Sequence, residues 1–86
     1  MFNGIIYNTG KIKLIKKNIN SIIITIETNL NFKKKDLGSS VSCDGMCLTL
    51  INIKDNLIDF YISKESLKRS NFISIKKNQI INLEKS

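Results

Sequence analysis

The chain has 86 residues, a mass of 9.8 kDa and a net charge of +7 from 14 basic and 7 acidic side chains, and it contains no histidine. This length predicts one domain with a modest core, because such a chain buries only about 60% of the surface that its unfolded form exposes. Without an imidazole, Ser-His-Asp and Cys-His relays and histidine-containing zinc sites are excluded.

The first half of the chain predicts two strands. Residues 12–15 (IKLI) partly alternate between apolar and polar side chains, and Asn8 and Gly10 interrupt this strand as a bend or bulge would. Residues 21–28 (SIIITIET) are β-branched almost throughout, and such side chains fit a pleated surface better than a helix. The lysine run at 33–35 is most simply a solvated turn.

The second half predicts a hairpin. Residues 46–53 (MCLTLINI) and 57–62 (LIDFYI) read as strands, and residues 54–56 (KDN) between them are suited to a tight turn. We therefore expect these two strands to pair in antiparallel fashion.

One helix and a last strand complete the pattern. Residues 63–69 (SKESLKR) begin with a capping serine, place Glu65 near the positive end of the helix dipole and end with basic side chains. Residues 73–83 (ISIKKNQIINL) partly alternate and predict a strand. Five to six strands in a chain too small for two stacked sheets favour a closed or nearly closed barrel, since closure removes exposed edges.

The positive charge is weak support for nucleic-acid binding. Ile, Lys and Asn supply almost half of the chain, Arg69 is the only arginine, and Ala, Pro and Trp are absent. This bias favours residues with A/T-rich codons. A protein that reads phosphates and bases more typically mixes in arginines and stacking aromatics. We expect no nucleic-acid partner.

Two cysteines, Cys43 and Cys47, cannot close a tetrahedral zinc shell without further ligands, so reduced, buried thiols are expected. The longest apolar stretch, residues 22–26, is interrupted by Thr25, and residues 1–10 lack a basic region ahead of an apolar one. We predict neither a signal peptide nor a membrane span, and hence a soluble, cytoplasmic protein.

Four motifs go beyond what a barrel requires. They are MFNGI at 1–5, DGMCLTL at 44–50, SKESLKRSN at 63–71 and KKNQIINLEK at 76–85. In order and spacing they resemble the N-terminal lumazine-binding barrel of riboflavin synthase, alpha chain, whose pattern is MFTGI, D/N-G-x-CLTV, SPETLxxTN and VGDxVNLER. The resemblance covers the whole chain.

The resemblance implies an all-β fold, a six-stranded antiparallel Greek-key barrel with one short helix, spanning residues 1–86. It also implies binding of 6,7-dimethyl-8-ribityllumazine or riboflavin. The family's enzyme, a transferase, disproportionates two lumazines to riboflavin and a pyrimidinedione without metal or organic cofactor. Its members carry two tandem barrels, and the active site forms between the N-terminal barrel of one subunit and the C-terminal barrel of another in a homotrimer.

Site residues follow from the resemblance, position by position. The positions that match the family's ligand contacts lie on the first strand, on the mid-domain strand and at the strand-to-helix junction: Gly4, Ile5, Ile6, Cys47, Leu48, Thr49, Tyr61, Ile62, Ser63, Lys64, Glu65 and Ser66. Cys47 and Phe2 are the candidate catalytic residues, Phe2 because an aromatic side chain near the facing ligand could order the reacting ring. No metal ligand is expected.

Each candidate also has a structural interpretation. Cys47 would by default be a small buried hydrophobic residue, and Thr49, on the same face, would be packed beside it. Ser63 and Glu65 are a helix cap and a partner of the helix dipole. Gly4 would be a bend at the start of a strand, and Lys64, in place of the family's frequent proline, would be solvated.

The chain lacks the family's histidine, which lies in a GGH stretch a little beyond the position of Ser86, and it lacks the residues of the C-terminal barrel. We therefore predict an N-terminal domain that binds a lumazine or flavin but turns it over poorly alone. Its ligand-side face would meet a second barrel, or a second copy of itself in a homodimer. The alternatives are a non-catalytic lumazine or flavin carrier, a small basic barrel that binds single-stranded nucleic acid, and a structural barrel without a ligand.

Overall fold

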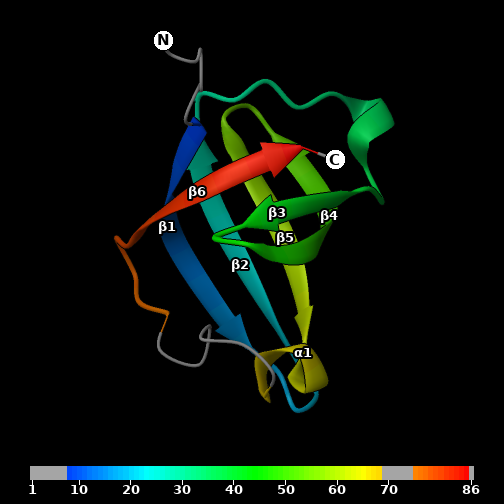
Figure 1. The fold of residues 1–86 in the computed structure, drawn as a ribbon, viewed down its shortest axis with the longest axis vertical. Coiled ribbons are helices and arrows are strands. Elements are labelled where there is room, and N and C mark those ends of the chain that lie inside the picture. The colour runs from blue at the N-terminus through cyan, green and yellow to red at the C-terminus, as the bar shows by residue number, and fades with distance from the viewer. Residues whose placement is uncertain (1–7, 69–74, 86) are drawn as a thin grey trace, which may run out of the picture.

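The computed structural model describes residues 8–68 and 75–85, with the side chains of residues 67 and 68 left aside (Figure 1). The elements in chain order are β1 (Asn8–Lys17), β2 (Ser21–Thr28), the 3-10 turn η1 (Lys34–Asp36), β3 (Ser40–Cys43), β4 (Met46–Lys54), β5 (Leu57–Ser63), α1 (Lys64–Lys68) and β6 (Ile80–Lys85).

The strands close into a barrel in the order β1-β2-β5-β4-β3-β6, and every neighbouring pair is antiparallel. Strands β3, β4 and β5 are neighbours in chain order, and β2, which precedes them in the chain, pairs with β5 rather than with β3. This is a Greek-key arrangement. The long link from β2 to β3 crosses one end of the barrel, and α1 lies at the other end (Figure 1). The six-stranded Greek-key barrel with one short helix is confirmed.

The predicted elements agree best with the structure where β-branched and apolar residues form a dense run. Strand β2 has the predicted bounds, and the hairpin of β4 and β5 is confirmed. The turn between them is shorter than predicted, because Lys54 still pairs with Leu57 and only Asp55 and Asn56 form the turn, Asp55 with a φ of 55°. The predicted helix is α1, which begins one residue later than expected.

The expected strands differ from the structure in two places. The segment SVSC forms β3, which was not predicted because four residues are too few to show a period. The last strand begins only at Ile80, since Asn78 takes a φ of 74° in a turn and the Lys76 carbonyl accepts a hydrogen bond from the Gln79 amide at 3.1 Å. The part of the prediction at residues 73 and 74 lies outside the described residues.

Gly10 has a different role from the predicted bend. It lies within β1, and the bulge falls instead between Ile12 and Leu14. A Cβ atom at Gly10 would lie 2.4 Å from Cγ2 of Ile26 and 3.0 Å from Cδ1 of Leu83. Glycine is therefore required here because core side chains pack directly against the backbone of β1.

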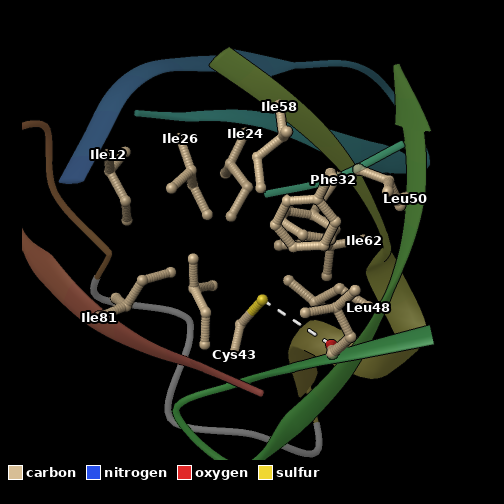
Figure 2. Packing of buried hydrophobic residues seen from close by; sticks show 13 residues of the cluster. Ile12, Ile24, Ile26, Phe32, Cys43, Leu48, Leu50, Ile58, Ile62 and Ile81 are labelled. Atoms are coloured by element: carbon tan, nitrogen blue, oxygen red, sulfur yellow. Dashed lines mark hydrogen bonds between the residues drawn. The ribbon is translucent and has the colours of Figure 1, made fainter. Parts of the chain in front are cut away.

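The core fills the inside of the barrel with aliphatic side chains and two aromatic rings (Figure 2). It consists of Ile12, Ile24, Ile26, Phe32, Val41, Cys43, Leu48, Leu50, Ile58, Phe60, Ile62, Ile81 and Leu83. Phe32 belongs to the link between β2 and β3. Lys85 in β6 lies over its ring, with the ammonium nitrogen 4.8 Å from the ring centre, and also donates a hydrogen bond to the Asn31 carbonyl. The crossing link is thus tied to the last strand.

Candidate functional site

Strand β4 presents two of the predicted site residues on the outside of the barrel. Cys47 and Thr49 are exposed, whereas Leu48 between them is 2% exposed and points into the core (Figure 2). The outward position of Cys47 contradicts the expected buried thiol. Leu48 can meet a ligand only through its backbone, because its side chain is enclosed by the barrel.

Strand β5 continues this outward surface. Tyr61 is opposite Thr49 on β4 and opposite Ile23 on β2. Ile62 is 1% exposed and belongs to the core, so only its backbone is open to a ligand. Ser63 is half-buried at the end of the strand, two residues beyond Tyr61 and so on the same side of the sheet. The barrel thus brings the β4 and β5 candidates together on one face, which we call the outer face of β4 and β5.

The junction of β5 and α1 is held by short polar side chains. The Ser63 hydroxyl oxygen accepts a hydrogen bond from the Ser66 amide at 3.1 Å, and the Ser63 hydroxyl donates to Ser66 Oγ at 2.9 Å. The Lys64 amide donates to the Asn20 carbonyl at 3.0 Å, which ties α1 to the turn between β1 and β2. The predicted capping role of Ser63 is present. Lys64 and Glu65 are exposed beside it.

A row of hydrogen-bonded polar side chains, which was not predicted from the sequence, lies next to Tyr61 on the side away from Ser63. The Thr25 hydroxyl donates to Asp59 Oδ1 at 2.6 Å, and the Asn52 amide group donates to Asp59 Oδ2 at 3.4 Å. These residues come from β2, β4 and β5 and are paired by register. Each of these residues is an ordinary polar residue on a strand. The one signal in the sequence was the spacing of two between Asp59 and Tyr61, which places both on the same face of β5.

Two hollows lie near the ends of the barrel. One, of about 210 Å³, is lined by Lys17, Asn18, Ile19, Ser21, Ile22 and Lys64, and so shares Lys64 with the predicted site. The other, of about 320 Å³, lies between β1, β2 and Asn56 and contains none of the predicted residues. Cys47, Thr49 and Tyr61 line neither of these two hollows.

The two thiols differ in chemistry as well as in position. Burial, together with smaller contributions from the nearby Asp44 and Cys47, raises the pKa of the Cys43 thiol to about 12. Its sulfur points into the core, 3.8 Å from the Val41 carbonyl oxygen (Figure 2). Cys47 is free and exposed. Only Cys47 is therefore available for reaction or ligand contact.

Four predicted residues, Phe2, Gly4, Ile5 and Ile6, lie outside the described residues. Across residues 8–68 and 75–85, no three or more His, Cys, Asp or Glu side chains are placed so that they could hold a metal ion. Within the same ranges, no helix has the length and apolar character needed to cross a membrane.

Comparison with known proteins gives one consistent result. Residues 3–86 match the family model described as "Lumazine binding domain". The riboflavin synthases of Actinobacillus pleuropneumoniae and of Buchnera aphidicola subsp. Baizongia pistaciae are 33% and 38% identical over the whole chain. This chain covers 40% and 41% of those two relatives.

Solved structures give the same picture. LumP complexed with riboflavin is similar with a TM-score of 0.74 and 28% identity, covering 99% of this chain and 46% of that one. LumP complexed with 6,7-dimethyl-8-(1'-D-ribityl) lumazine has the same TM-score and identity. The chain thus spans less than half of the proteins that it matches.

Proposed function

The chain belongs to the lumazine-binding domain family, and we propose that its barrel binds 6,7-dimethyl-8-ribityllumazine or riboflavin on the outer face of β4 and β5, beside α1. The observation that carries this proposal is that Cys47, Thr49, Tyr61 and Ser63 come together on one exposed face of a barrel whose family is defined by such ligands. LumP, which is similar in structure to this chain, has been solved in complex with each of these ligands.

The chemistry of the face suits such a ligand. A flat heterocycle rich in amide groups needs donors and acceptors at its edge, and a ribityl tail needs short hydroxyl and carboxylate partners. Thr49 and Ser63 supply hydroxyls on the strands, and Ser66 and Glu65 supply a hydroxyl and a carboxylate on α1. Phe2, Gly4, Ile5 and Ile6 are proposed to complete the site.

We further propose that this domain is the N-terminal barrel of a riboflavin synthase, and that by itself it binds ligand without efficient turnover. The reaction needs two lumazines, one of which donates a four-carbon unit to the other, and a single barrel holds one. The second would be held by a C-terminal barrel. A second copy of this chain in a homodimer would cover the same face without supplying the residues of that barrel. Cys47 and Phe2 remain the candidate catalytic residues at that interface.

A second candidate function is a non-catalytic lumazine or flavin carrier. The observation that favours it is that two similar solved structures are LumP complexes with the two ligands. The two functions predict the same binding by this barrel and differ in turnover.

Fluorescence titration of the purified chain with riboflavin and with dimethylribityllumazine tests the binding. We expect a saturable change in ligand intensity and anisotropy that moderate salt barely alters, because the contact set is largely uncharged. Absence of any change up to about 1 mM ligand, on folded protein, would contradict the proposal. The nucleic-acid alternative predicts instead an affinity for a single-stranded oligonucleotide that collapses with added salt.

Incubation with dimethylribityllumazine alone tests turnover. We expect no measurable riboflavin from this chain, and formation of riboflavin when the C-terminal half of a relative such as the Actinobacillus enzyme is added. Riboflavin formation by the chain alone would overturn the claim that a second, different barrel is required. Failure of every such mixture would favour the carrier.

A further inference from the structure

Tyr61 is an exposed aromatic ring on the outer face of β4 and β5. The residues whose side chains are described include three aromatic ones, of which Phe32 and Phe60 are buried in the core and Tyr61 is 42% exposed. The core does not need this ring, because the adjacent Phe60 already fills the inside of the barrel. An exposed aromatic on a sheet face presents a large apolar surface that a ligand can cover.

The surroundings of Tyr61 combine an apolar flank with hydrogen-bonding groups. Directly opposite residues on antiparallel strands have Cβ atoms about 4.5–5.5 Å apart, so Thr49 on β4 and Ile23 on β2 flank the ring. One step along the strands in one direction lies the row of Thr25, Asp59 and Asn52. In the other direction lies Ser63.

This arrangement fits a flat molecule with polar edges. The ring and Ile23 offer contact to the face of such a molecule. Hydroxyl, carboxylate and amide groups on one side, and the Ser63 hydroxyl on the other, lie where its edges and its tail would be. Stacking on an aromatic side chain adds to binding because offset stacked π-systems attract one another beyond the area they bury.

We infer that the Tyr61 ring is the surface on which the heterocycle of the bound lumazine or flavin stacks. This inference rests on the proposed function and deepens it. Tyr61 then sets the preference of the site for aromatic heterocycles, and Thr49 and Ser63 act on the edges of the same ring system.

The stacked geometry has a spectroscopic consequence. An excited isoalloxazine ring takes one electron from a phenol ring in contact with it and returns the electron without light emission, so no net chemistry occurs and the fluorescence is quenched. A phenyl ring is much harder to oxidise. Replacing the phenol by a phenyl ring therefore leaves the stacking in place and restores emission.

The test is a riboflavin titration of the whole chain, followed by anisotropy for affinity and by intensity for quenching. Tyr61→Leu keeps an apolar side chain without a π-face, and we expect its Kd to rise about tenfold or more. Tyr61→Phe is expected to keep the Kd within about twofold and to make bound riboflavin brighter. Ile80→Ser, at a side chain of β6 that is 56% exposed, is the matched control and is expected to change neither.

The outcomes separate this inference from the proposed function. Absence of riboflavin binding by the unaltered chain overturns the proposed function, and the inference with it. Binding by the unaltered chain with an unchanged Kd for Tyr61→Leu overturns the inference alone. Equal losses for Tyr61→Phe and Tyr61→Leu would show that the hydroxyl makes the contact, and unchanged brightness for Tyr61→Phe would place the ring away from the heterocycle. Either result also overturns it.

Discussion

The inner and outer faces of β4 and β5 are made by alternate residues of the same two strands, yet the side chains of one face are buried and those of the other are exposed. Leu48, Leu50, Phe60 and Ile62 are buried in the barrel, while Cys47, Thr49 and Tyr61 are exposed between them. The difference separates two tasks. Inward side chains stabilise the barrel, whereas outward side chains can contact a ligand. Substitutions on the inner face should therefore lower the free energy of unfolding, and substitutions on the outer face should change ligand affinity.

The largest expected effect is on the inner face. Phe60→Ala removes a fully buried ring and leaves a cavity, which costs about 3–5 kcal/mol of the free energy of unfolding. Tyr61→Ala, one residue away on the outer face, should cost about 1 kcal/mol or less. Denaturant unfolding followed by circular dichroism measures both. Similar losses for the two variants would contradict the division between the faces.

The two thiols give a second contrast. The raised pKa of the Cys43 thiol lowers its thiolate fraction about a thousandfold relative to an ordinary thiol. We expect iodoacetamide at pH 8 to modify Cys47 readily, and Cys43 only after unfolding, with peptide mass spectrometry as the measurement. Rapid modification of Cys43 in the folded chain would show that the core opens easily. Cys47→Ser is the control that assigns the fast reaction.

The same pKa shift predicts a dependence of stability on pH. Because the Cys43 pKa is higher in the folded chain than its ordinary value of 9.0, the unfolded chain loses this proton first. The contribution of the protonated thiol to stability is fully present below pH 9.0 and is lost as the pH rises toward about 12. Cys43→Ala should flatten the fall in the thermal midpoint over this range.

On the outer face, Thr49→Val should affect the ligand and leave the barrel unchanged. If the hydroxyl meets a buried ligand group, its loss should weaken binding by about 1–3 kcal/mol, because that group is left unpaired. The titration described above gives the change in affinity, and the unfolding curve should remain that of the unaltered chain. An unchanged affinity would mean that Thr49 is only part of the sheet surface.

The smallest effect is expected at the end of the barrel, away from both faces. The Asp36 carboxylate accepts a hydrogen bond from the Lys33 amide at 2.8 Å, which lowers its pKa, and Lys85, 3.5 Å away, lowers that pKa further. A lowered pKa contributes stability that is present above the ordinary pKa of Asp and lost as the pH falls through the folded value.

Asp36→Asn should therefore lower the thermal midpoint slightly near neutral pH, and the difference from the unaltered chain should vanish in acid. Glu84→Gln is a control at a carboxylate in β6. A difference that persists at acid pH would mean that the charge of Asp36 is not what ties the crossing link to β6.

Much of the barrel was predictable because the β-branched and apolar runs at residues 21–28, 46–53 and 57–62, and the turn between the last two, are local signals. The four motifs and their spacing were enough to identify the family and to choose the candidate residues. Strand β3 and the start of β6 were missed because short or irregular segments become strands only through their partners. Asn78 delays the start of the last strand by taking a left-handed conformation that composition alone does not reveal.

By itself, then, the sequence determined the all-β class, the hairpin, the short helix and the likeness to lumazine-binding barrels. Only the tertiary structure decided that Cys43 faces inward and Cys47 outward, that Gly10 makes room for Ile26, and that Thr25, Asp59 and Asn52 form one row. The physical reason is that alternation along a strand separates two faces without saying which one is inside. That choice depends on cross-strand register and barrel closure, which join residues far apart in the chain.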